Sequence, residues 1–306
     1  MSTGVLLLTY GTSETSDGVE DYLRSVYRGE PPAATVAEFK RRFDLIGRSP
    51  LIDITRQQGA ALQALLDREH GEGAYVVEIG MLHTAPRIAD ALARLVAAGV
   101  DRVVGIVLAP QYSALIMGGY NRAVEAAVEE QAVTIPVAVA GAWHDVPGWM
   151  DSLAERVKET IGEVGDLPVV FTAHSLPESV VTRDPGYLDQ LHATIGGVVE
   201  RLGLPDGRWQ FGYQSAGHTP EEWLKPDFKD LVPDLARAGH AGVVFVPVQF
   251  VADNLETLYD IDVAGREEAE EAGLAFHRVP VPNVSPSFIE ALRQVVQREM
   301  AAVSAG

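Results

Sequence analysis

The sequence predicts an α/β fold in which two similarly built halves each contain a parallel sheet. Short runs of Val, Ile and Leu alternate with longer segments of helical period along all 306 residues. The short runs are apolar on both faces, which is typical of parallel strands that helices cover on each side. Three sequence patterns of the first half also recur in the same order in the second half.

The expected strands hold about five residues each, and in a covered parallel sheet they need no polar face. They are Val5–Thr9, Tyr75–Ile79, Arg102–Leu108, Thr134–Val139, Pro168–Thr172, Trp209–Tyr213, Gly242–Val246 and Ala275–Val279. The expected helices lie between these strands, where apolar residues recur every three or four positions. They are Gly18–Tyr27, Val36–Leu45, Asp53–Glu69, Pro86–Ala98, Asn121–Gln131, Gly148–Val164, Tyr187–Leu202, Phe228–Ala238, Asn254–Ala272 and Pro286–Met300.

The repeated patterns predict two Rossmann-like domains, each a parallel sheet flanked by helices, with the active-site cleft between them. The repeats pair Gly105–Pro110 with Gly242–Pro247, His83–Pro86 with His218–Pro220, and Leu6–Tyr10 with Val169–Ala173. We expect an N-terminal domain over residues 1–145 and a C-terminal domain over residues 146–306, whose last helix packs back on the first. In such sheets ligands bind beyond the carboxyl ends of the strands, so the cleft is the expected site.

Composition and charge argue against several functions. The chain has 24 Lys and Arg against 43 Asp and Glu, a net charge of −19, which disfavours nucleic acid and anionic membranes as partners. It has no Cys, which excludes disulfides, thiol nucleophiles and cysteine-ligated iron–sulfur clusters. No signal peptide or membrane-spanning run is expected, so we predict a cytoplasmic protein without stable membrane insertion.

Chemically active side chains follow three of the expected strands. Tyr10 follows the first strand, His174 the fifth, and Glu256 and Asp260 come after the seventh. Because the carboxyl ends of parallel strands share one edge, a phenol, an imidazole and carboxylates are expected there together. Imidazole and carboxylate suit proton transfer, and they also suit divalent metals such as Fe²⁺, Co²⁺, Ni²⁺ or Zn²⁺.

Each of these residues also has a purely structural interpretation. A histidine such as His174 is more often a satisfied polar residue, and a strand-end tyrosine such as Tyr10 a packing residue. Glu256 and Asp260 share one helical face that is usually solvated, while Asp253 and Glu256 fit a capping box. The chain lacks a dinucleotide-binding glycine motif, a phosphate-binding loop and a His-Glu-x-x-His motif, and Gly212–Gly217 matches a nucleophile elbow only superficially.

A basic cluster stands out in this acidic chain. It contains Lys40, Arg41, Arg42 and Arg48, with Arg24 and Arg28 upstream. Arg binds carboxylates bidentately, so the cluster fits the carboxylates of a ligand as well as it fits the solvent face of a helix. Leu115–Asn121 is an apolar segment with two glycines, and it fits either the wall of a flat hydrophobic ligand site or a connection to the next helix.

Five motifs together resemble the ferrochelatase family. They are Tyr10–Thr12, Ser49–Leu51, Leu108–Ser113, Ala173–Pro177 and Phe250–Asp260. The resemblance runs from about Leu6 to the C-terminus, and the variant with Tyr10 is similar to the coproporphyrin ferrochelatases of monoderm bacteria. It implies insertion of Fe²⁺ into coproporphyrin III, in the coproporphyrin-dependent route to haem, by two Rossmann-like domains that flank a porphyrin cleft.

The resemblance also implies roles for particular residues. His174 corresponds to a metal ligand and proton acceptor, and Glu256 to its partner carboxylate across the cleft, with Asp260 as a further candidate for guiding the metal. Tyr10 corresponds to a tyrosine that ligates the product iron on the other face. The implied substrate contacts are Tyr27, Arg42, Phe43, Ser49 and Tyr120.

The chain departs from the family pattern at three positions. Tyr27 precedes Arg28 where many members have two Arg, Phe43 replaces a common Tyr, and Ala264 replaces a second metal-site Glu of some members. The resemblance therefore implies one propionate contact fewer and an incomplete outer metal site. Some relatives bind a [2Fe–2S] cluster through Cys, so no such cluster is expected here. No prosthetic group is expected either, because Fe²⁺ is a substrate.

Three other functions stay open at this stage. They are iron insertion into protoporphyrin IX, cobalt or nickel insertion into sirohydrochlorin, and tetrapyrrole carriage without catalysis. Sirohydrochlorin has eight carboxylates and needs more basic residues than the chain places near the cleft, and a carrier gives no reason for His174 and Glu256 to occur together. The expected partners are coproporphyrin III and Fe²⁺, with transient handover to the next haem-pathway enzyme as a further expectation.

Overall fold

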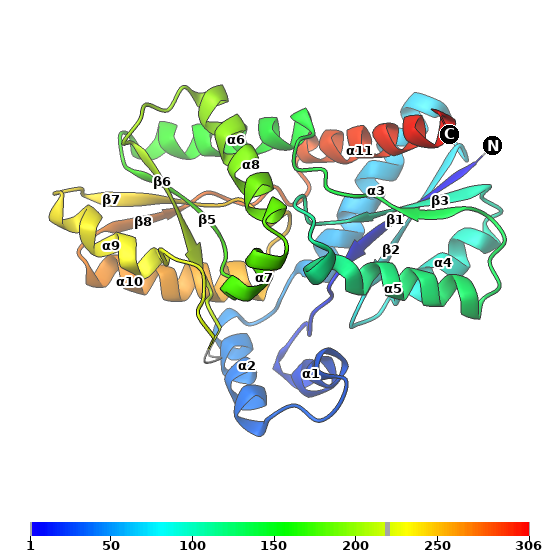
Figure 1. Ribbon diagram of the computed structural model, residues 1–306, viewed down its shortest axis with the longest axis horizontal. Helices are drawn as coiled ribbons and strands as arrows, with labels where there is room; N and C mark the ends of the chain where they lie inside the picture. The colour runs from blue at the N-terminus through cyan, green and yellow to red at the C-terminus, as the bar shows by residue number, and fades with distance from the viewer. Residues whose placement is uncertain (1, 218–220, 306) are drawn as a thin grey trace.

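The chain folds into two four-stranded parallel sheets that lie side by side (Figure 1). The computed structural model describes residues 2–217 and 221–305. The first sheet has the order β2-β1-β3-β4 and the second has the order β6-β5-β7-β8. The strands are β1 (Thr3–Thr9), β2 (Tyr75–Met81), β3 (Arg102–Val107), β4 (Val137–Val139), β5 (Val169–His174), β6 (Trp209–Gln214), β7 (Gly242–Pro247) and β8 (Ala275–Arg278). The predicted α/β class with two parallel sheets is therefore confirmed.

The matching strand orders account for the repeated sequence patterns. Gly105–Pro110 begins in β3 and Gly242–Pro247 forms β7, and both strands hold the third place in their sheets. Leu6–Tyr10 and Val169–Ala173 belong to β1 and β5, which both hold the second place. The third pattern ends in residues 218–220, which lie outside the described residues. Equivalent strands therefore carry similar sequences because they occupy equivalent buried positions.

Helices cover both faces of each sheet (Figure 1). Those of the first half are α3 (Leu51–His70), α4 (Ile88–Ala97) and α5 (Ala114–Glu130). Those of the second half are α6 (Pro147–Val164), α7 (Glu178–Arg183), α8 (Gly186–Leu202), α9 (Phe228–Arg237), the π-helix η2 (Glu256–Gly265), α10 (Arg266–Glu271) and α11 (Pro286–Ala305). In the part of the chain that the structure describes, no helix combines the length and apolarity that crossing a bilayer requires.

Successive residues of β1 enter two different cores, as expected for a strand with two buried faces. Leu6 and Leu8 pack with residues of α4 and α5, whereas Leu7 packs with residues of α3 and α11. The second of these cores continues to Phe171 of β5, so one apolar core runs through both halves. Helix α11 packs on α3 as well as on α6. The division of domains at residues 145 and 146 stays a prediction.

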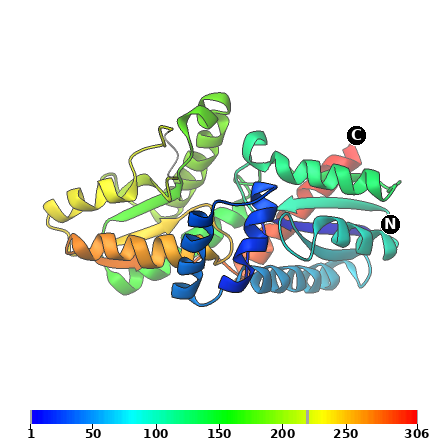
Figure 2. The ribbon, with the colours of Figure 1, turned by 90° about the horizontal axis from the view of Figure 1, so that it is seen from below.

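Two helices form a small lobe that stands apart from the sheets. They are α1 (Val19–Tyr27) and α2 (Ala33–Ile46), preceded by the 3₁₀ turn η1 (Ser16–Gly18). The lobe lies below the junction of the two sheets in Figure 1 and across the middle of the molecule in Figure 2. Val19, Leu23 and Phe43 form its buried core, and Leu255, just before η2, packs against that core. The lobe therefore contacts the segment that carries Glu256.

The helix predictions differ from the structure at two places that matter for the site. Helix α5 begins at Ala114, seven residues before the predicted start at Asn121, so Leu115–Asn121 is helical. Two glycines in this segment disfavour a helix, but burial of Met117 and Tyr120 against β1 and α4 outweighs that cost of about 1 kcal/mol per glycine. The predicted helix Asn254–Ala272 divides into η2 and α10, and α7 was not predicted.

Candidate active site at the strand ends

His174 is the last residue of β5, and its backbone is anchored independently of its side chain. Its backbone N–H donates to Oε1 of Gln249 at 2.6 Å, and the side-chain amide of Gln249 donates to the hydroxyl of Tyr187. In the sheet His174 stands beside Gln214, the last residue of β6. The side chain of His174 keeps 40% of its surface exposed. The residue is therefore fixed at the strand edge and open to a ligand.

The imidazole of His174 contacts the carboxylate of Glu256 directly. Its Nδ1 lies 2.7 Å from Oε1 of Glu256. Because an ionised carboxylate only accepts hydrogen bonds, Nδ1 of the neutral ring carries the hydrogen and Nε2 keeps a lone pair. Burial alone lowers the pKa of His174, but the charges of Glu256 and Asp260 and the hydrogen bond to Glu256 outweigh burial and raise it. Burial raises the pKa of Glu256, yet His174 opposes this effect and the net pKa is lowered, so Glu256 is the ionised partner.

The residues before Glu256 hold the start of the π-helix η2. Oδ1 of Asn254 accepts from the backbone N–H groups of Glu256 and Thr257 at 2.8 and 3.2 Å. Oγ1 of Thr257 accepts from the backbone N–H of Asn254 at 2.9 Å. The capping box therefore uses Asn254 and Thr257, one residue later than the predicted Asp253 and Glu256. This register lets the Glu256 side chain reach His174 instead of capping its own helix.

The side of η2 away from this pair is held by Arg278 of β8. The guanidinium of Arg278 lies 3.1 Å from Asp253 and 2.7 Å from Asp262, and 13% of its side chain is exposed. Asp253, the predicted cap, is thus a salt-bridge partner. These pairs fix η2 to β8, while Glu256 and Asp260 contact residues of the candidate site.

Asp260 pairs with Arg42 of α2. Nη1 of Arg42 lies 3.0 Å from Oδ1 of Asp260, and Nε of Arg42 donates to Glu38 at 2.9 Å. The guanidinium also lies 4.9 Å from the ring centroid of Tyr259. Burial and the charge of Glu256 raise the pKa of Asp260, and the charge of Arg42 opposes this shift. The interpretation of Glu256 and Asp260 as a solvated helical face is therefore wrong.

Two polar residues of the site were not predicted from the sequence patterns. Gln214 is 5% exposed, and neither of its amide atoms has a hydrogen-bond partner among the described residues. Ser215 follows it with φ 58°, and its buried hydroxyl also has no partner there. Both side chains lie close enough to Glu256 to favour its ionised form and to contribute to its lowered pKa, although neither has the geometry of a full hydrogen bond to it. Their position at the end of β6, the neighbour of β5, was the signal that could have identified them.

Tyr10 follows β1 and contacts His83, which follows β2. The two ring centroids are 4.4 Å apart, and the backbone N–H of His83 donates to the carbonyl of Tyr10 at 3.0 Å. Tyr10 is 42% exposed, so its phenol is accessible. Burial is the main cause that raises the pKa values of Tyr22 and Tyr120. In the sequence, His83 belongs only to a repeated pattern, and that pattern does not predict its contact with Tyr10.

Comparison with known proteins connects these features to one family. The family model described as Ferrochelatase matches residues 2–300. The chain belongs to the ferrochelatase family. A protein named ferrochelatase from Herpetosiphon aurantiacus is 38% identical over 96% of this chain and 98% of its own. Proteins named coproporphyrin III ferrochelatase from Bacillus subtilis and Geobacillus thermodenitrificans are 36% and 35% identical over 97% of this chain, and over 97% and 96% of their own.

Solved structures share the fold of this ferrochelatase-family chain at much lower identity. SirB from Bacillus subtilis with Fe³⁺ has a TM-score of 0.61 and 12% identity, covering 98% of both chains. CbiX, described as the terminal enzyme of sirohaem biosynthesis in denitrifying bacteria, has a TM-score of 0.57 and 11% identity over 97% of this chain and 99% of its own. At such identities the likeness concerns the fold alone.

The remaining residues for which the family resemblance implies a role differ in accessibility. Tyr27, at the end of α1, is 50% exposed. Phe43 has no exposed surface because it fills the core of the α1–α2 lobe, so this conformation offers no contact to a macrocycle through its side chain. Tyr120 and Ser49 are also buried, at 6% and 1% exposure, and the hydroxyl of Ser49 has no hydrogen-bond partner among the described residues. The implied substrate contacts of these four residues stay predictions.

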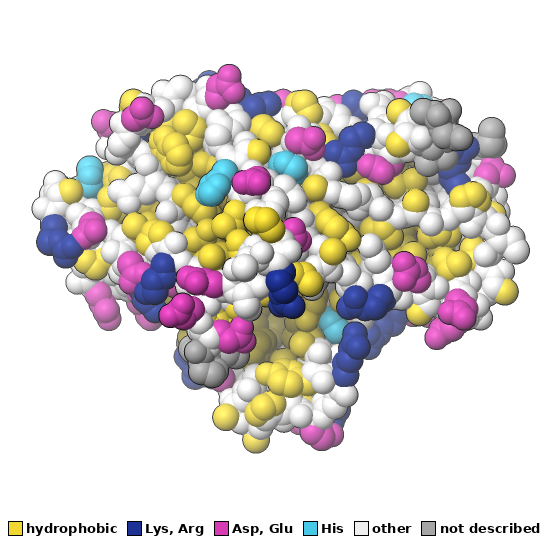
Figure 3. All heavy atoms as spheres, in the orientation of Figure 1, with side chains coloured by type: hydrophobic (Ala, Val, Ile, Leu, Met, Phe, Trp, Pro, Cys, Tyr) yellow, Lys and Arg dark blue, Asp and Glu magenta, His cyan; other side chains and the backbone are white. Residues whose placement is uncertain are grey.

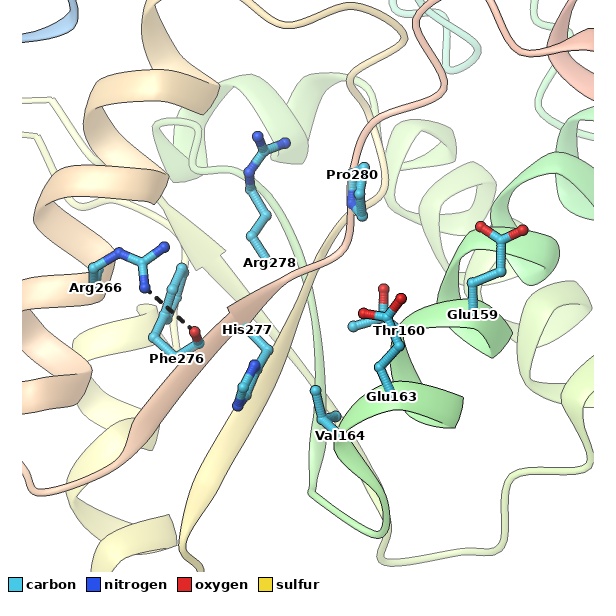
Figure 4. A pocket seen from close by; sticks show the side chains of 9 residues that line it. All are labelled: Glu159, Thr160, Glu163, Val164, Arg266, Phe276, His277, Arg278 and Pro280. Carbon is cyan, nitrogen blue, oxygen red and sulfur yellow. Dashed lines mark hydrogen bonds between the residues drawn. The ribbon is translucent and has the colours of Figure 1, made fainter.

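The surface of the ferrochelatase-family chain is hollowed between the α1–α2 lobe and the rest of the molecule. Figure 3 shows hydrophobic side chains inside this hollow, with Lys or Arg and His side chains at its edge. A separate cavity of about 320 Å³ lies between α6 and β8 and is lined by Glu159, Glu163, Arg266 and His277, among others (Figure 4). None of the predicted site residues lines that cavity.

The candidate site offers few protein ligands to a metal ion. Among residues 2–217 and 221–305, no three His, Asp or Glu side chains lie close enough together to enclose one. His174 and Glu256 provide one imidazole nitrogen and one carboxylate, a combination that suits Fe²⁺. A metal held by two protein ligands keeps its other positions for water or for a substrate.

Proposed function

We propose that this ferrochelatase-family chain inserts Fe²⁺ into coproporphyrin III and releases Fe-coproporphyrin III, as a lyase of haem biosynthesis. The observation that carries the proposal is the 2.7 Å contact between Nδ1 of His174 and Glu256 at the end of β5. It combines a base and an anion at one accessible edge. Metal insertion needs both, because two pyrrole protons must leave while a hydrated cation enters.

His174 is proposed to accept these protons. Glu256 fixes the ring so that Nε2 presents its lone pair. A proton that moves from a pyrrole nitrogen to Nε2 leaves an imidazolium, which the carboxylate of Glu256 stabilises. The raised pKa of His174 makes the ring a stronger base than free imidazole. The same ring can pass each proton to water before the next transfer.

Glu256 and Asp260 are proposed to attract Fe²⁺ and replace part of its water shell. Oxygen and nitrogen donors together suit this cation, and the buried polar groups of Gln214 and Ser215 help to keep Glu256 ionised. Tyr10, whose phenol is accessible and packs on His83, is proposed to ligate the iron of the product. We further propose that Fe²⁺ serves as a substrate only and that the chain holds no prosthetic group or iron–sulfur cluster.

The choice of coproporphyrin III over protoporphyrin IX is supported by the relatives named coproporphyrin III ferrochelatase, which match over nearly the full chain. Coproporphyrin III carries four propionates and protoporphyrin IX carries two. Arg42 stands at the contact between the α1–α2 lobe and η2, where a guanidinium can bind a propionate bidentately. A cytoplasmic location and transient handover of the product to the next haem-pathway enzyme are part of the same proposal.

The test is an anaerobic insertion assay with Fe²⁺, run in parallel on coproporphyrin III and protoporphyrin IX and followed by absorbance. We expect turnover of coproporphyrin III and little or none of protoporphyrin IX. Turnover confined to protoporphyrin IX would keep the chelatase and overturn the choice of substrate. Binding of both porphyrins with turnover of neither would favour a sirohydrochlorin chelatase or a carrier, and cobalt insertion into sirohydrochlorin would separate these two.

A further inference from the structure

Arg42 joins the α1–α2 lobe to Asp260 of the π-helix η2. Its guanidinium makes four contacts: the carboxylate of Asp260 at 3.0 Å, the carboxylate of Glu38 at 2.9 Å, and the rings of Tyr259 and Phe39 at 4.9 and 5.7 Å from their centroids. The side chains of Arg42 and Asp260 are each 21% exposed. Neighbouring Arg41 also contacts Glu38 and Tyr259, but not Asp260.

Asp260 therefore has two competing electrostatic neighbours. The charge of Glu256, the partner of His174, raises the pKa of Asp260, and the charge of Arg42, which lies 3.0 Å from Asp260, lowers it. As long as Arg42 holds Asp260, a cation near Glu256 meets a guanidinium charge and a carboxylate that is already paired. The guanidinium and an entering cation repel each other at a partly buried site. The ion pair between Arg42 and Asp260 therefore weakens cation binding.

We propose that Arg42 exchanges partners, so that a carboxylate of the tetrapyrrole takes it from Asp260 and thereby makes Asp260 available to the entering cation. This inference deepens the proposed function and rests on its assignment of Arg42 to a propionate. The exchange replaces one carboxylate on the guanidinium by another. It therefore leaves Arg42 satisfied while it adds one uncompensated negative charge beside Glu256.

The exchange makes the two substrates help each other. A bound tetrapyrrole carboxylate increases the affinity of the site for a divalent cation, and by linkage the cation increases the affinity for the tetrapyrrole to the same extent. For one partly exposed ion pair the coupling is expected to be about threefold to tenfold. Because the coupling is reciprocal, it favours the state with both substrates bound and does not fix which of them binds first.

The first experiment is a fluorescence titration of the full-length chain with metal-free coproporphyrin III, with no metal added. Asp260→Asn removes the competitor for Arg42, so this variant should bind coproporphyrin III about threefold to tenfold more tightly than wild type. Arg42→Gln should weaken binding. In the double variant the gain from Asp260→Asn should vanish, because no guanidinium is left to release.

Two controls separate exchange at Arg42 from other effects. Asp260→Asn in an Arg41→Gln background should keep its gain, because Arg41 supports the same lobe contact without touching Asp260. The tetramethyl ester of coproporphyrin III has no carboxylates, and wild type and Asp260→Asn should bind it equally. The titration with the ester compares wild type with the single variant Asp260→Asn. It therefore remains informative even where a double variant fails to fold.

The second experiment measures the cation directly, by calorimetric titration of wild type with Cd²⁺. Coproporphyrin III that already holds Cu²⁺ serves as the bound tetrapyrrole, so no insertion accompanies the titration. Its presence should raise the Cd²⁺ affinity of wild type about threefold to tenfold and leave that of Arg42→Gln unchanged. An unchanged Cd²⁺ affinity in wild type would overturn the proposal.

The outcomes distinguish this inference from the proposed function. A gain from Asp260→Asn that persists without Arg42 would mean general charge repulsion and would overturn the exchange. Weaker binding by Arg42→Gln with no gain from Asp260→Asn would also overturn the exchange, yet leave Arg42 as a propionate contact. Undiminished binding by Arg42→Gln, or no binding of coproporphyrin III by wild type, would overturn the proposed function at this residue as well.

Discussion

One hydrogen bond determines how the imidazole of His174 can react. With Nδ1 committed to Glu256, the only nitrogen that can take a proton or bind a metal is Nε2. The anchoring of the His174 backbone by Gln249 limits how far that nitrogen can move. A base held in one tautomer and one orientation loses little entropy when it reacts, which is the advantage of preorganised groups in catalysis.

We expect His174→Ala to reduce Fe²⁺ insertion by at least about a hundredfold, because general-base catalysis contributes about that much and more. Binding of coproporphyrin III should persist, since the imidazole is not among the implied propionate contacts. The measurements are anaerobic turnover and a fluorescence titration. His240→Ala removes an exposed histidine after α9 and should behave as wild type. Unchanged turnover of His174→Ala would refute its role.

Glu256→Gln should lower the pKa of His174, because it removes the charge that raises it against the effect of burial. The ion pair stabilises the fold fully below the ordinary histidine pKa of about 6.5, and this contribution is lost as pH rises through the raised pKa. The free energy of unfolding of the variant should therefore fall below that of wild type mainly at pH values under the raised pKa of His174. Proton NMR of the imidazole, followed from pH 5 to 9, measures the shift.

Asp262→Asn is the matched control for that titration. Asp262 lies on the same π-helix but pairs with Arg278 at 2.7 Å, and the pKa of His174 does not depend on it. The NMR titration of His174 in this variant should match that of wild type. A pKa of His174 that is the same in Glu256→Gln and wild type would contradict the pairing.

At the scale of elements, the cap of η2 decides where Glu256 points. Asn254→Ala removes the acceptor of two backbone N–H groups, and loss of such a cap costs about 1 kcal/mol of stability. We expect turnover to fall with it, because the first residue of the helix is Glu256 itself. Asn254→Asp keeps an acceptor oxygen and should restore most of both quantities. Urea unfolding measures the stability, and the insertion assay measures the turnover. Full activity of Asn254→Ala would show that the cap does not position Glu256.

Most elements could be predicted from the sequence because their cause is local. All eight strands overlap a predicted strand, although only β1, β3, β5 and β7 are buried on both faces along nearly their whole length. The start of α5 was not predicted, because tertiary burial of Met117 and Tyr120 overrides the low helix propensity of the two glycines between them. The π-helical form of η2 was not predicted either. The observed cap also lies one residue later than the expected one.

The candidate site could be predicted only in part, for a related reason. His174 and Glu256 stood out because strand ends of one sheet share an edge, and the structure brings them together. The ion pair between Arg42 and Asp260 joins residues 218 positions apart in the chain, and no local pattern encodes such a contact. The sequence gives no signal at Gln214, and only the structure shows that its amide is buried near Glu256 without a hydrogen-bond partner among the described residues.

At the scale of the whole molecule, a few buried polar bridges join the two halves around the site. Nε2 of Gln58, on α3, donates to the carbonyl oxygens of Val251 at 2.9 Å and Asn283 at 2.8 Å. Gln190 of α8 exchanges two hydrogen bonds with the backbone of Tyr112, before α5. These bridges are directional, whereas the shared apolar core is not, so they set the relative position of the two strand edges.

Gln58 provides the sharpest test of that idea, because its side chain has no exposed surface and it holds the segment that leads into η2. Gln58→Leu keeps the volume but leaves the buried carbonyl of Val251 and the partly buried carbonyl of Asn283 without their donor, which should cost about 2 kcal/mol of stability. Displacement of residues 251–255 should also misplace Glu256 and lower insertion by about tenfold.

Gln63→Leu, on the same helix, is the matched control. Gln63 bonds Tyr75 and Val77 of β2 at 3.0 and 2.7 Å, so its loss destabilises the first half alone. We expect Gln63→Leu to lose stability in urea without losing insertion activity at a temperature where both variants are folded. Equal activity losses in the two variants would mean that stability alone controls turnover. A selective loss in Gln58→Leu would mean that the position of one half relative to the other is itself a catalytic requirement.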